Sequence, residues 1–175
     1  TIQTNGTLIN EEWCELFKAN NFLVGVSIDG PKDIHDAFRK DKGGRPTFDK
    51  IIDGIRLMAY HGVEYNTLTT VNKLSEGRGR EVYSFLKSIG SRYMQFLPVV
   101  EYVKIIEGSS RPAIVPPNTQ GSQLAEWSVS AEGFGAFMCD IFDQWVLSDV
   151  GTYYVQLFDT ALAQWAGVRP ALCSF

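Results

Sequence analysis

The chain has 175 residues, of which 45% are hydrophobic and 21% are charged, and its formal net charge is -4. This composition is typical of a globular domain with a sizeable core, and the scattered lysines and arginines argue against a basic face for nucleic acid. No apolar run approaches the roughly 20 residues of a membrane span, and no signal peptide is visible. We therefore expect neither a nucleic-acid partner nor a membrane partner.

The cysteines are Cys14, Cys139 and Cys173, which lie far apart and form no CxxC pair. This spacing argues against a disulfide framework and predicts a reducing, cytoplasmic location. Cys14 and Cys139 lie in amphipathic stretches, and free cysteine is among the most buried residue types. We therefore predict that both pack in the core.

Short apolar runs alternate with amphipathic stretches in the first half of the chain. The run 22–27 is typical of a strand buried on both faces. Asn10 and Thr47 stand where they can cap the helices that follow them. The predicted elements are a strand end at 1–4, a helix at 10–20, a strand at 22–27, a helical turn at 35–39 and a helix at 48–61.

The alternation continues in the second half and is interrupted once. Residues 101–130 are rich in Pro, Ser and Gly and read as a long irregular insertion, which is usually functional or mobile in a compact domain. The other predicted elements are strands at 65–71, 93–98 and 153–158, and helices at 80–88, 132–148 and 159–166.

Strands that alternate with helices are the signature of parallel βαβ units and of an α/β fold. Two architectures fit, a doubly wound open sheet and a βα barrel, and both place the ligand site at the carboxyl ends of the strands. Polar residues do follow the strands at those points. They are residues 4–6, 27–30 and 70–72, and Pro98 with Glu101.

Several kinds of chemistry lack their usual motif. The chain has no phosphate-binding glycine loop and no HExxH or other metal-spaced His and Cys cluster. Ser27 ends a strand, but the absence of GxSxG around it argues against a serine hydrolase. Asp29 could contact a ligand or cap the turn. His35 and His61 are single, and we interpret both as structural.

Two motifs and their order nevertheless resemble a known family. They are TNGTL at 4–8 and SIDGP at 27–31, and further similarity runs through most of the chain except about 102–123. These residues resemble the anaerobic sulfatase-maturating enzymes, also called arylsulfatase regulators, which are radical SAM enzymes with a SPASM extension. The resemblance implies a partial parallel (βα) barrel of radical-SAM type, with about the last four strands present in residues 1–166. Residues 167–175 would then begin the SPASM region.

The resemblance also implies an activity for the parent enzyme. Enzymes of this family oxidise a Cys or Ser side chain of a sulfatase polypeptide to formylglycine. A 4Fe–4S cluster reduces S-adenosyl-L-methionine (AdoMet), the resulting 5′-deoxyadenosyl radical removes a hydrogen from the target, and auxiliary clusters accept the remaining electron. A flavodoxin or ferredoxin would supply the reducing electron.

The resemblance assigns roles to particular residues. Ser27 and Arg39 match positions that contact AdoMet, and Val100 matches a position that touches its adenine. A hydroxyl suits the polar groups of AdoMet, and a guanidinium fork suits its carboxylate. Three further side chains are expected to point into the barrel mouth, namely Gln3, Asn5 and Gln95.

The same resemblance predicts that residues 1–175 are a fragment. The CxxxCxxC and Gly-Gly-Glu motifs would precede Thr1, and the carboxylate base would follow Phe175. The fragment would then contain no catalytic residue, and whether it is an enzyme by itself stays open. Cys173 matches the first SPASM cysteine, which ligates an auxiliary cluster, but one thiolate cannot hold a cluster.

Three alternatives remain open at this point. The parent could be another SPASM peptide maturase, because the insertion at 101–130 departs from the family pattern. The chain could be a non-catalytic remnant that binds a sulfatase peptide, or a cluster-free metabolic βα-barrel enzyme. The sequence does not distinguish a Cys-type from a Ser-type target, and it does not identify the sulfatase or the oligomeric state.

Overall fold

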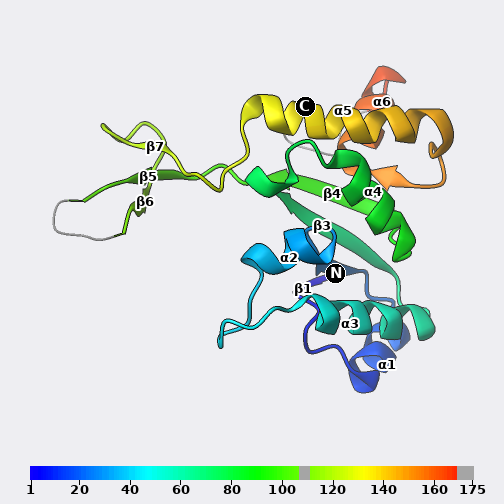
Figure 1. The fold of residues 1–175 in the computed structure, drawn as a ribbon. Helices are drawn as coiled ribbons and strands as arrows, with labels where there is room; N and C mark the ends of the chain where they lie inside the picture. Colours follow the sequence, from blue (N-terminus) through cyan, green and yellow to red (C-terminus); the bar gives the residue numbers. More distant parts are fainter. Residues whose placement is uncertain (107–110, 169–175) are drawn as a thin grey trace.

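The computed structural model describes residues 1–106 and 111–168, and its centre is a parallel sheet (Figure 1). The strands, in their order across the sheet, are β1 (Ile2–Thr4), β2 (Val24–Ser27), β3 (Tyr65–Val71), β4 (Tyr93–Pro98) and β8 (Tyr154–Val155). Every neighbouring pair is parallel. This order has no reversal, whereas a doubly wound sheet has one, so the described strands do not form a doubly wound sheet. The prediction of about four strands is one short of the five observed.

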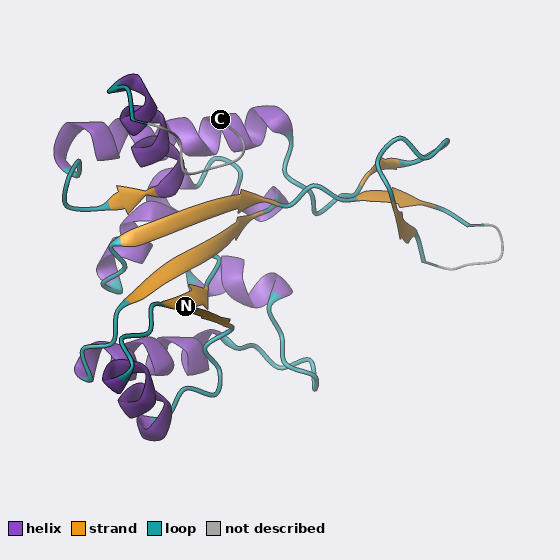
Figure 2. Ribbon diagram, turned by 180° about the vertical axis from the view of Figure 1, so that it is seen from behind, coloured by secondary structure: helices purple, strands orange, loops and turns teal. Residues whose placement is uncertain are grey.

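Helices lie along the sheet from its β1 edge to its β8 edge. Figures 1 and 2 show α1 to α3 beside β1 and β2, and α4 to α6 beside β4 and β8. The described helices are α1 (Glu11–Ala19), α2 (Lys32–Phe38), α3 (Phe48–Tyr60), the short 3-10 helix η1 (Lys73–Ser75), α4 (Gly79–Ser88), α5 (Ala131–Ser148) and α6 (Gln156–Trp165). None of the helices in the described ranges combines the length and apolar character that a membrane span requires.

Burial alternates along the strands. In β3, Thr67, Thr69 and Val71 are buried, whereas the residues between them are partly exposed. The buried residues join helix side chains such as Ile55 and Leu86 in one core. Because successive side chains of a strand point to opposite faces, the helices cover one face of the sheet, and the other face is open in the described part of the chain.

Two helix caps show what the local sequence determines and what it does not. Asn10 caps α1 as predicted, because its side chain accepts a hydrogen bond from the Trp13 backbone at 3.0 Å. Thr47 is the residue before α3, but its side chain makes no capping bond. Asp36 of α2 performs this function, since its Oδ1 accepts from the Thr47 and Phe48 backbone N–H groups at 3.1 and 3.0 Å. The predicted cap is therefore wrong, and a tertiary contact replaces it.

Two element boundaries also differ from prediction. The helical turn predicted at 35–39 is the two-turn helix α2, which begins at Lys32. The strand predicted at 153–158 is only β8, and α6 begins three residues before its predicted start at 159. Helical geometry from Gln156 onward lets Phe158 pack against Phe142 and Trp145 of α5, at ring distances of 5.2 and 5.4 Å.

The predicted irregular insertion at 101–130 contains a small antiparallel sheet. Its strands are β5 (Tyr102–Lys104), β6 (Ala113–Val115) and β7 (Gln123–Leu124), in the order β6-β5-β7. Figures 1 and 2 show this projecting sheet extending away from the main body. Strands of two or three residues are too short to give a periodic signal, which is why the sequence reads as loop.

The predictions that Cys14 and Cys139 pack in the core have different outcomes. Cys14 is buried as predicted, and burial raises the pKa of its thiol. Cys139 is exposed, so the prediction that it packs in the core is wrong. It lies on the solvent side of α5, while its neighbours Met138 and Ile141 face the core.

Candidate functional site

The open face of the sheet carries a row of polar side chains. The strand register places these polar residues in neighbouring positions, with Gly25, Leu68 and Leu97 among them; the polar residues are Gln3, Ser27, Asn66, Thr70 and Gln95. The side chains of Gln3, Ser27, Asn66 and Gln95 make no hydrogen bond to another described residue. These groups are therefore available to a ligand on this face.

Asp29 follows β2 and organises the carboxyl end of that strand. It is 1% exposed. Its Oδ1 accepts hydrogen bonds from the Thr70 backbone at 3.0 Å and the Thr70 hydroxyl at 2.7 Å. The Arg39 guanidinium donates through Nε to Oδ2 at 2.5 Å and through Nη2 to Oδ1 at 2.9 Å. These four donors satisfy a carboxylate that is shielded from water, and the contacts link β2, β3 and the end of α2.

His35 completes the fixed geometry of this turn. Its Nδ1 accepts from the Asp29 backbone at 3.2 Å, and its Nε2 lies 3.2 Å from the Thr47 hydroxyl. That hydroxyl donates to the Arg39 carbonyl at 2.9 Å, so it accepts from Nε2 and fixes the neutral tautomer with hydrogen on Nε2. Burial lowers the pKa of His35 below its ordinary value. The structure therefore confirms a structural role for His35.

Arg39 lies at the end of α2 with its side chain 27% exposed. Asp29 takes the Nε and Nη2 edge of the guanidinium. On the other edge, Nη1 makes no hydrogen bond or ion pair with another described residue. Arg39 can therefore offer donors to a ligand from one edge while the other edge anchors it.

Val100 and Asn5, two more of the residues expected to lie near AdoMet, differ in character. Val100 follows β4 and is 53% exposed, next to Glu101, whose carboxylate accepts from the Trp127 indole at 2.5 Å. Asn5 follows β1, but its Oδ1 is taken by the Thr7 backbone and hydroxyl at 3.2 and 2.9 Å. Val100 thus presents an apolar surface at the strand ends, whereas the carbonyl oxygen of Asn5 serves its own turn.

A cavity on the same face lies nearer the amino ends of the strands. Its volume is about 310 Å³, and Asn66, Gln95 and the Tyr93 and Tyr154 side chains line it. The two tyrosine rings stack with centroids 4.8 Å apart. Asp159 also lines it; its buried Oδ2 has no partner among the described residues, and burial raises the pKa of this carboxyl. Sequence reasoning named only Gln95 here, and the alternation of β3 and β4 could have indicated Asn66 and Tyr93.

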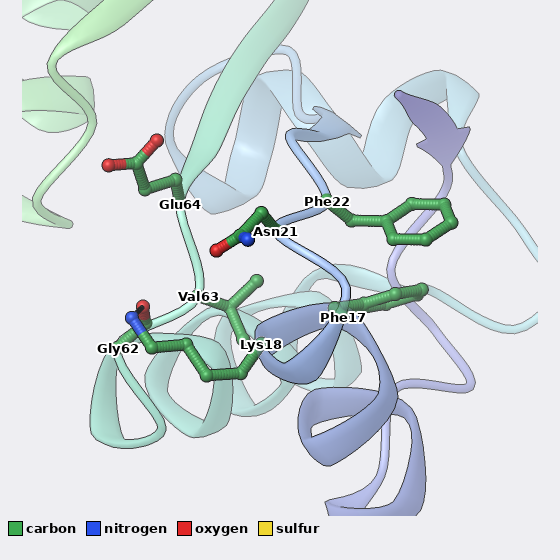
Figure 3. Close-up of a pocket in the computed structure, with 7 residues that line it drawn as sticks. All are labelled: Phe17, Lys18, Asn21, Phe22, Gly62, Val63 and Glu64. Atoms are coloured by element: carbon green, nitrogen blue, oxygen red, sulfur yellow. Dashed lines mark hydrogen bonds between the residues drawn. The ribbon is translucent and has the colours of Figure 1, made fainter.

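A second pocket lies beside the segments that lead into β2 and β3. Figure 3 shows it between the end of α1 and the segment that leads into β3. Lys18 reaches across it and donates to the Gly62 carbonyl at 2.8 Å. His61, which directly follows α3, pairs with Glu11 in the first turn of α1. These contacts join α1 to α3 and lie away from the polar strand ends, so we interpret this pocket as structural.

The described residues do not fit an iron–sulfur cluster or another metal ion. No group of three or more His, Cys, Asp and Glu side chains converges anywhere in residues 1–106 and 111–168. Cys14 and Cys139 are free, one buried and one exposed. The predicted cluster ligand Cys173 lies outside the described residues.

Comparison with known proteins connects this geometry to one group of enzymes. Residues 1–86 match the family model of the radical SAM superfamily. The chain is 46% identical to the serine-type anaerobic sulfatase-maturating enzyme of Bacteroides thetaiotaomicron, over 99% of this chain and 42% of that protein. It is 34% identical to the cysteine-type enzyme of Clostridium novyi, over 99% of this chain and 43% of that protein. The chain thus spans about two fifths of the length of these relatives.

Solved structures give the same result. The structure described as native anSMEcpe with bound AdoMet superposes with a TM-score of 0.80 and 28% sequence identity, over 98% of this chain and 43% of that chain. A structure of the same protein with AdoMet and the Cp18Cys peptide also gives a TM-score of 0.80 over 98% of this chain. The parallel sheet and its helices are therefore shared with an AdoMet-binding protein.

Proposed function

Because this chain is a homologue of the anaerobic sulfatase-maturating enzymes, we propose that it forms the AdoMet-binding part of an enzyme that converts a Cys or Ser of a sulfatase to formylglycine. The observation that carries this proposal is the 46% identity over 99% of the chain. The free Ser27 hydroxyl on the open face of the matching sheet adds a chemical reason. Within the proposal, the partner is a sulfatase polypeptide and the reducing electron comes from a flavodoxin or ferredoxin.

The finer fold assignment is part of the same proposal. Residues 1–166 form the carboxyl-terminal part of a partial (βα) barrel, and 167–175 begin a SPASM region. Support comes from the unbroken strand order and from the placement of the helices on one face of the sheet. A barrel has its helices outside and its ligand site at the carboxyl ends of the strands.

The residues at the strand ends fit the chemical groups of AdoMet. Ser27 can hydrogen-bond a ribose or amino-acid group, and the free edge of Arg39 can donate to a carboxylate. Val100 offers an exposed apolar surface that suits adenine. Gln3, Asn5 and Gln95 complete the set, because the amide groups of Gln3 and Gln95 and the amide nitrogen of Asn5 make no hydrogen bond to another described residue. Ser27, Arg39 and Val100 would hold and orient AdoMet, which would supply the radical chemistry when bound.

The iron–sulfur part of the proposal requires residues other than those described. The clusters of a radical SAM enzyme need several thiolates, and the described cysteines do not converge. We propose that the cluster ligands lie elsewhere in the parent protein, with Cys173 as one auxiliary ligand. A CxxxCxxC sequence encoded upstream of Thr1 would support this, and its absence from the full gene would support the binding-remnant alternative.

The experiment uses the full-length gene product, reconstituted with iron and sulfide without oxygen. It is incubated with AdoMet, a chemical reductant and two sulfatase peptides that differ only in Cys or Ser at the target position. We expect mass spectrometry to show an aldehyde at the target, formed with loss of two hydrogens from the serine peptide. A cross-linked peptide without aldehyde would instead favour another SPASM maturase, and an unchanged peptide with intact clusters would contradict the proposal.

A further inference from the structure

The Asp29 carboxylate is not accessible to a ligand. It is 1% exposed, and both of its oxygens accept hydrogen bonds from Arg39 or Thr70. A group in this position acts only through its partners. Of these partners, Thr70 is a partly exposed residue near the end of β3, and Arg39 has one guanidinium edge without a hydrogen bond to another described residue.

The bidentate contact fixes where that free edge points. A guanidinium held through Nε and Nη2 lies in the plane of its carboxylate partner, so Nη1 and the outer hydrogen of Nη2 have a defined direction. A free arginine side chain would have to lose its rotamer freedom on binding a ligand. Asp29 removes that cost in advance, because it holds Arg39 in one arrangement before any ligand arrives.

The backbone of this turn is held separately from the ion pair. His35 receives the Asp29 backbone N–H, and Thr47 donates to the Arg39 carbonyl. His35 and Thr47 also contact each other at 3.2 Å. The backbone of the turn is therefore held partly by His35 and Thr47, whereas the Asp29 carboxylate both binds Thr70 of β3 and orients the Arg39 side chain.

We propose that Asp29 is a positioning residue for AdoMet, which acts by aiming the free edge of Arg39 at the polar groups of that cofactor. This inference rests on the proposed function. Thr70 supports the arrangement from β3, since its two hydrogen bonds to Oδ1 hold the carboxylate in place near the end of that strand.

The test is a double-mutant cycle on AdoMet affinity, measured by equilibrium dialysis with the full-length protein. Asp29→Asn keeps the shape but loses the charge, and we expect it to weaken AdoMet binding roughly tenfold, within the range of couplings between contacting residues. In an Arg39→Ala background the same change should have no further effect on the dissociation constant. Equal effects of Asp29→Asn in both backgrounds would overturn the proposal, as would unchanged affinity in the single variant.

A matched control separates positioning from general stability. Asp149 is also buried, and it accepts from Lys87 at 2.6 Å and from the Tyr83 hydroxyl at 2.8 Å, away from the open face. Asp149→Asn should lower the melting temperature and leave AdoMet affinity unchanged. If it weakens AdoMet binding as much as Asp29→Asn does, the role of Asp29 is merely structural and the proposal fails.

A milder variant keeps the test decisive if Asp29→Asn does not fold. Thr70→Val removes one hydrogen bond to Oδ1, and we expect about threefold weaker AdoMet binding that disappears in the Arg39→Ala background. Unchanged affinity in Thr70→Val would then overturn the inference. Failure of the wild-type protein to bind AdoMet at all would instead contradict the proposed function itself.

Discussion

The turn after β2 and the projecting sheet β5–β7 are built in opposite ways. In the turn, Asp29, His35 and Thr47 are buried and each is hydrogen-bonded to another member of the network or to its neighbours. In the projecting sheet, Ile114 of β6 is 65% exposed, and Ile105, which directly follows β5, is 73% exposed. The geometry of the turn is therefore fixed by tertiary polar contacts. The projecting sheet instead depends on backbone hydrogen bonds between short strands, with few buried apolar side chains to support them. A site that needs fixed donors fits the first region better than the second.

The largest effect should come from breaking the network of the turn. Asp29→Ala leaves the Arg39 guanidinium and the Thr70 backbone N–H without their acceptor, and we expect a loss of about 3 kcal/mol in the free energy of unfolding. Urea denaturation measures it. As a control, Asp53→Ala removes an exposed pair with Arg56 and should change stability very little. Similar losses in the two variants would show that the turn is not specially fixed.

A pH effect should follow from His35. Burial lowers the pKa of His35 from its ordinary value of 6.5, so the unfolded chain binds a proton more readily than the folded protein. Stability from this group is therefore fully present above pH 6.5 and declines as the pH falls below it. Urea midpoints of the wild type and His35→Gln between pH 7.5 and pH 5 test this. The difference between the two proteins should narrow at low pH, and a constant difference would contradict the prediction.

A smaller effect is expected in the projecting sheet. Val103 is 4% exposed and lies in β5, the central strand of that sheet. Val103→Ala should cost about 1 kcal/mol locally and should speed amide hydrogen exchange in β5 and β6 without changing exchange in β3. Val26→Ala in β2 is the matched control, which should speed exchange across the main sheet. Loss of protection in β3 from the Val103 variant would mean that the two sheets unfold together.

The smallest effect concerns the two described cysteines. Cys139 is exposed, whereas Cys14 is buried with a raised thiol pKa. A thiol reagent should therefore modify Cys139 in the native protein with no measurable change in stability, and Cys14 only after denaturant is added. Peptide mapping identifies the modified residue. Native labelling of Cys14 at a similar rate would show that α1 opens readily.

The sequence predicted the main strands and the position of Ser27 because these depend on local patterns. Apolar runs bounded by Gly, Pro and Asp mark strands wherever the fold places them. It did not predict the Asp29–Arg39 pair, since the two residues meet only when the turn folds back. The capping of α3 by Asp36 has the same cause.

Other features were missed because the local pattern was weak or misleading. Helix α5 carries aromatic and aliphatic residues around much of its surface, so the sequence could not show which side faces solvent at Cys139. The strands β5 to β7 are too short for periodicity to reveal. The side chain of Asn66, which makes no hydrogen bond to another described residue, could have been recognised from the alternation of β3. Like Ser27, it belongs to the open face.

The central claim is that the open face at the strand ends binds AdoMet through Ser27. Its most direct test is equilibrium dialysis of AdoMet with the full-length protein, its Ser27→Ala variant and a Ser84→Ala control on the exposed side of α4. Loss of one hydrogen bond predicts about fivefold weaker AdoMet binding for Ser27→Ala. The control variant should bind AdoMet as tightly as the wild type. Unchanged affinity in the Ser27 variant would contradict the account.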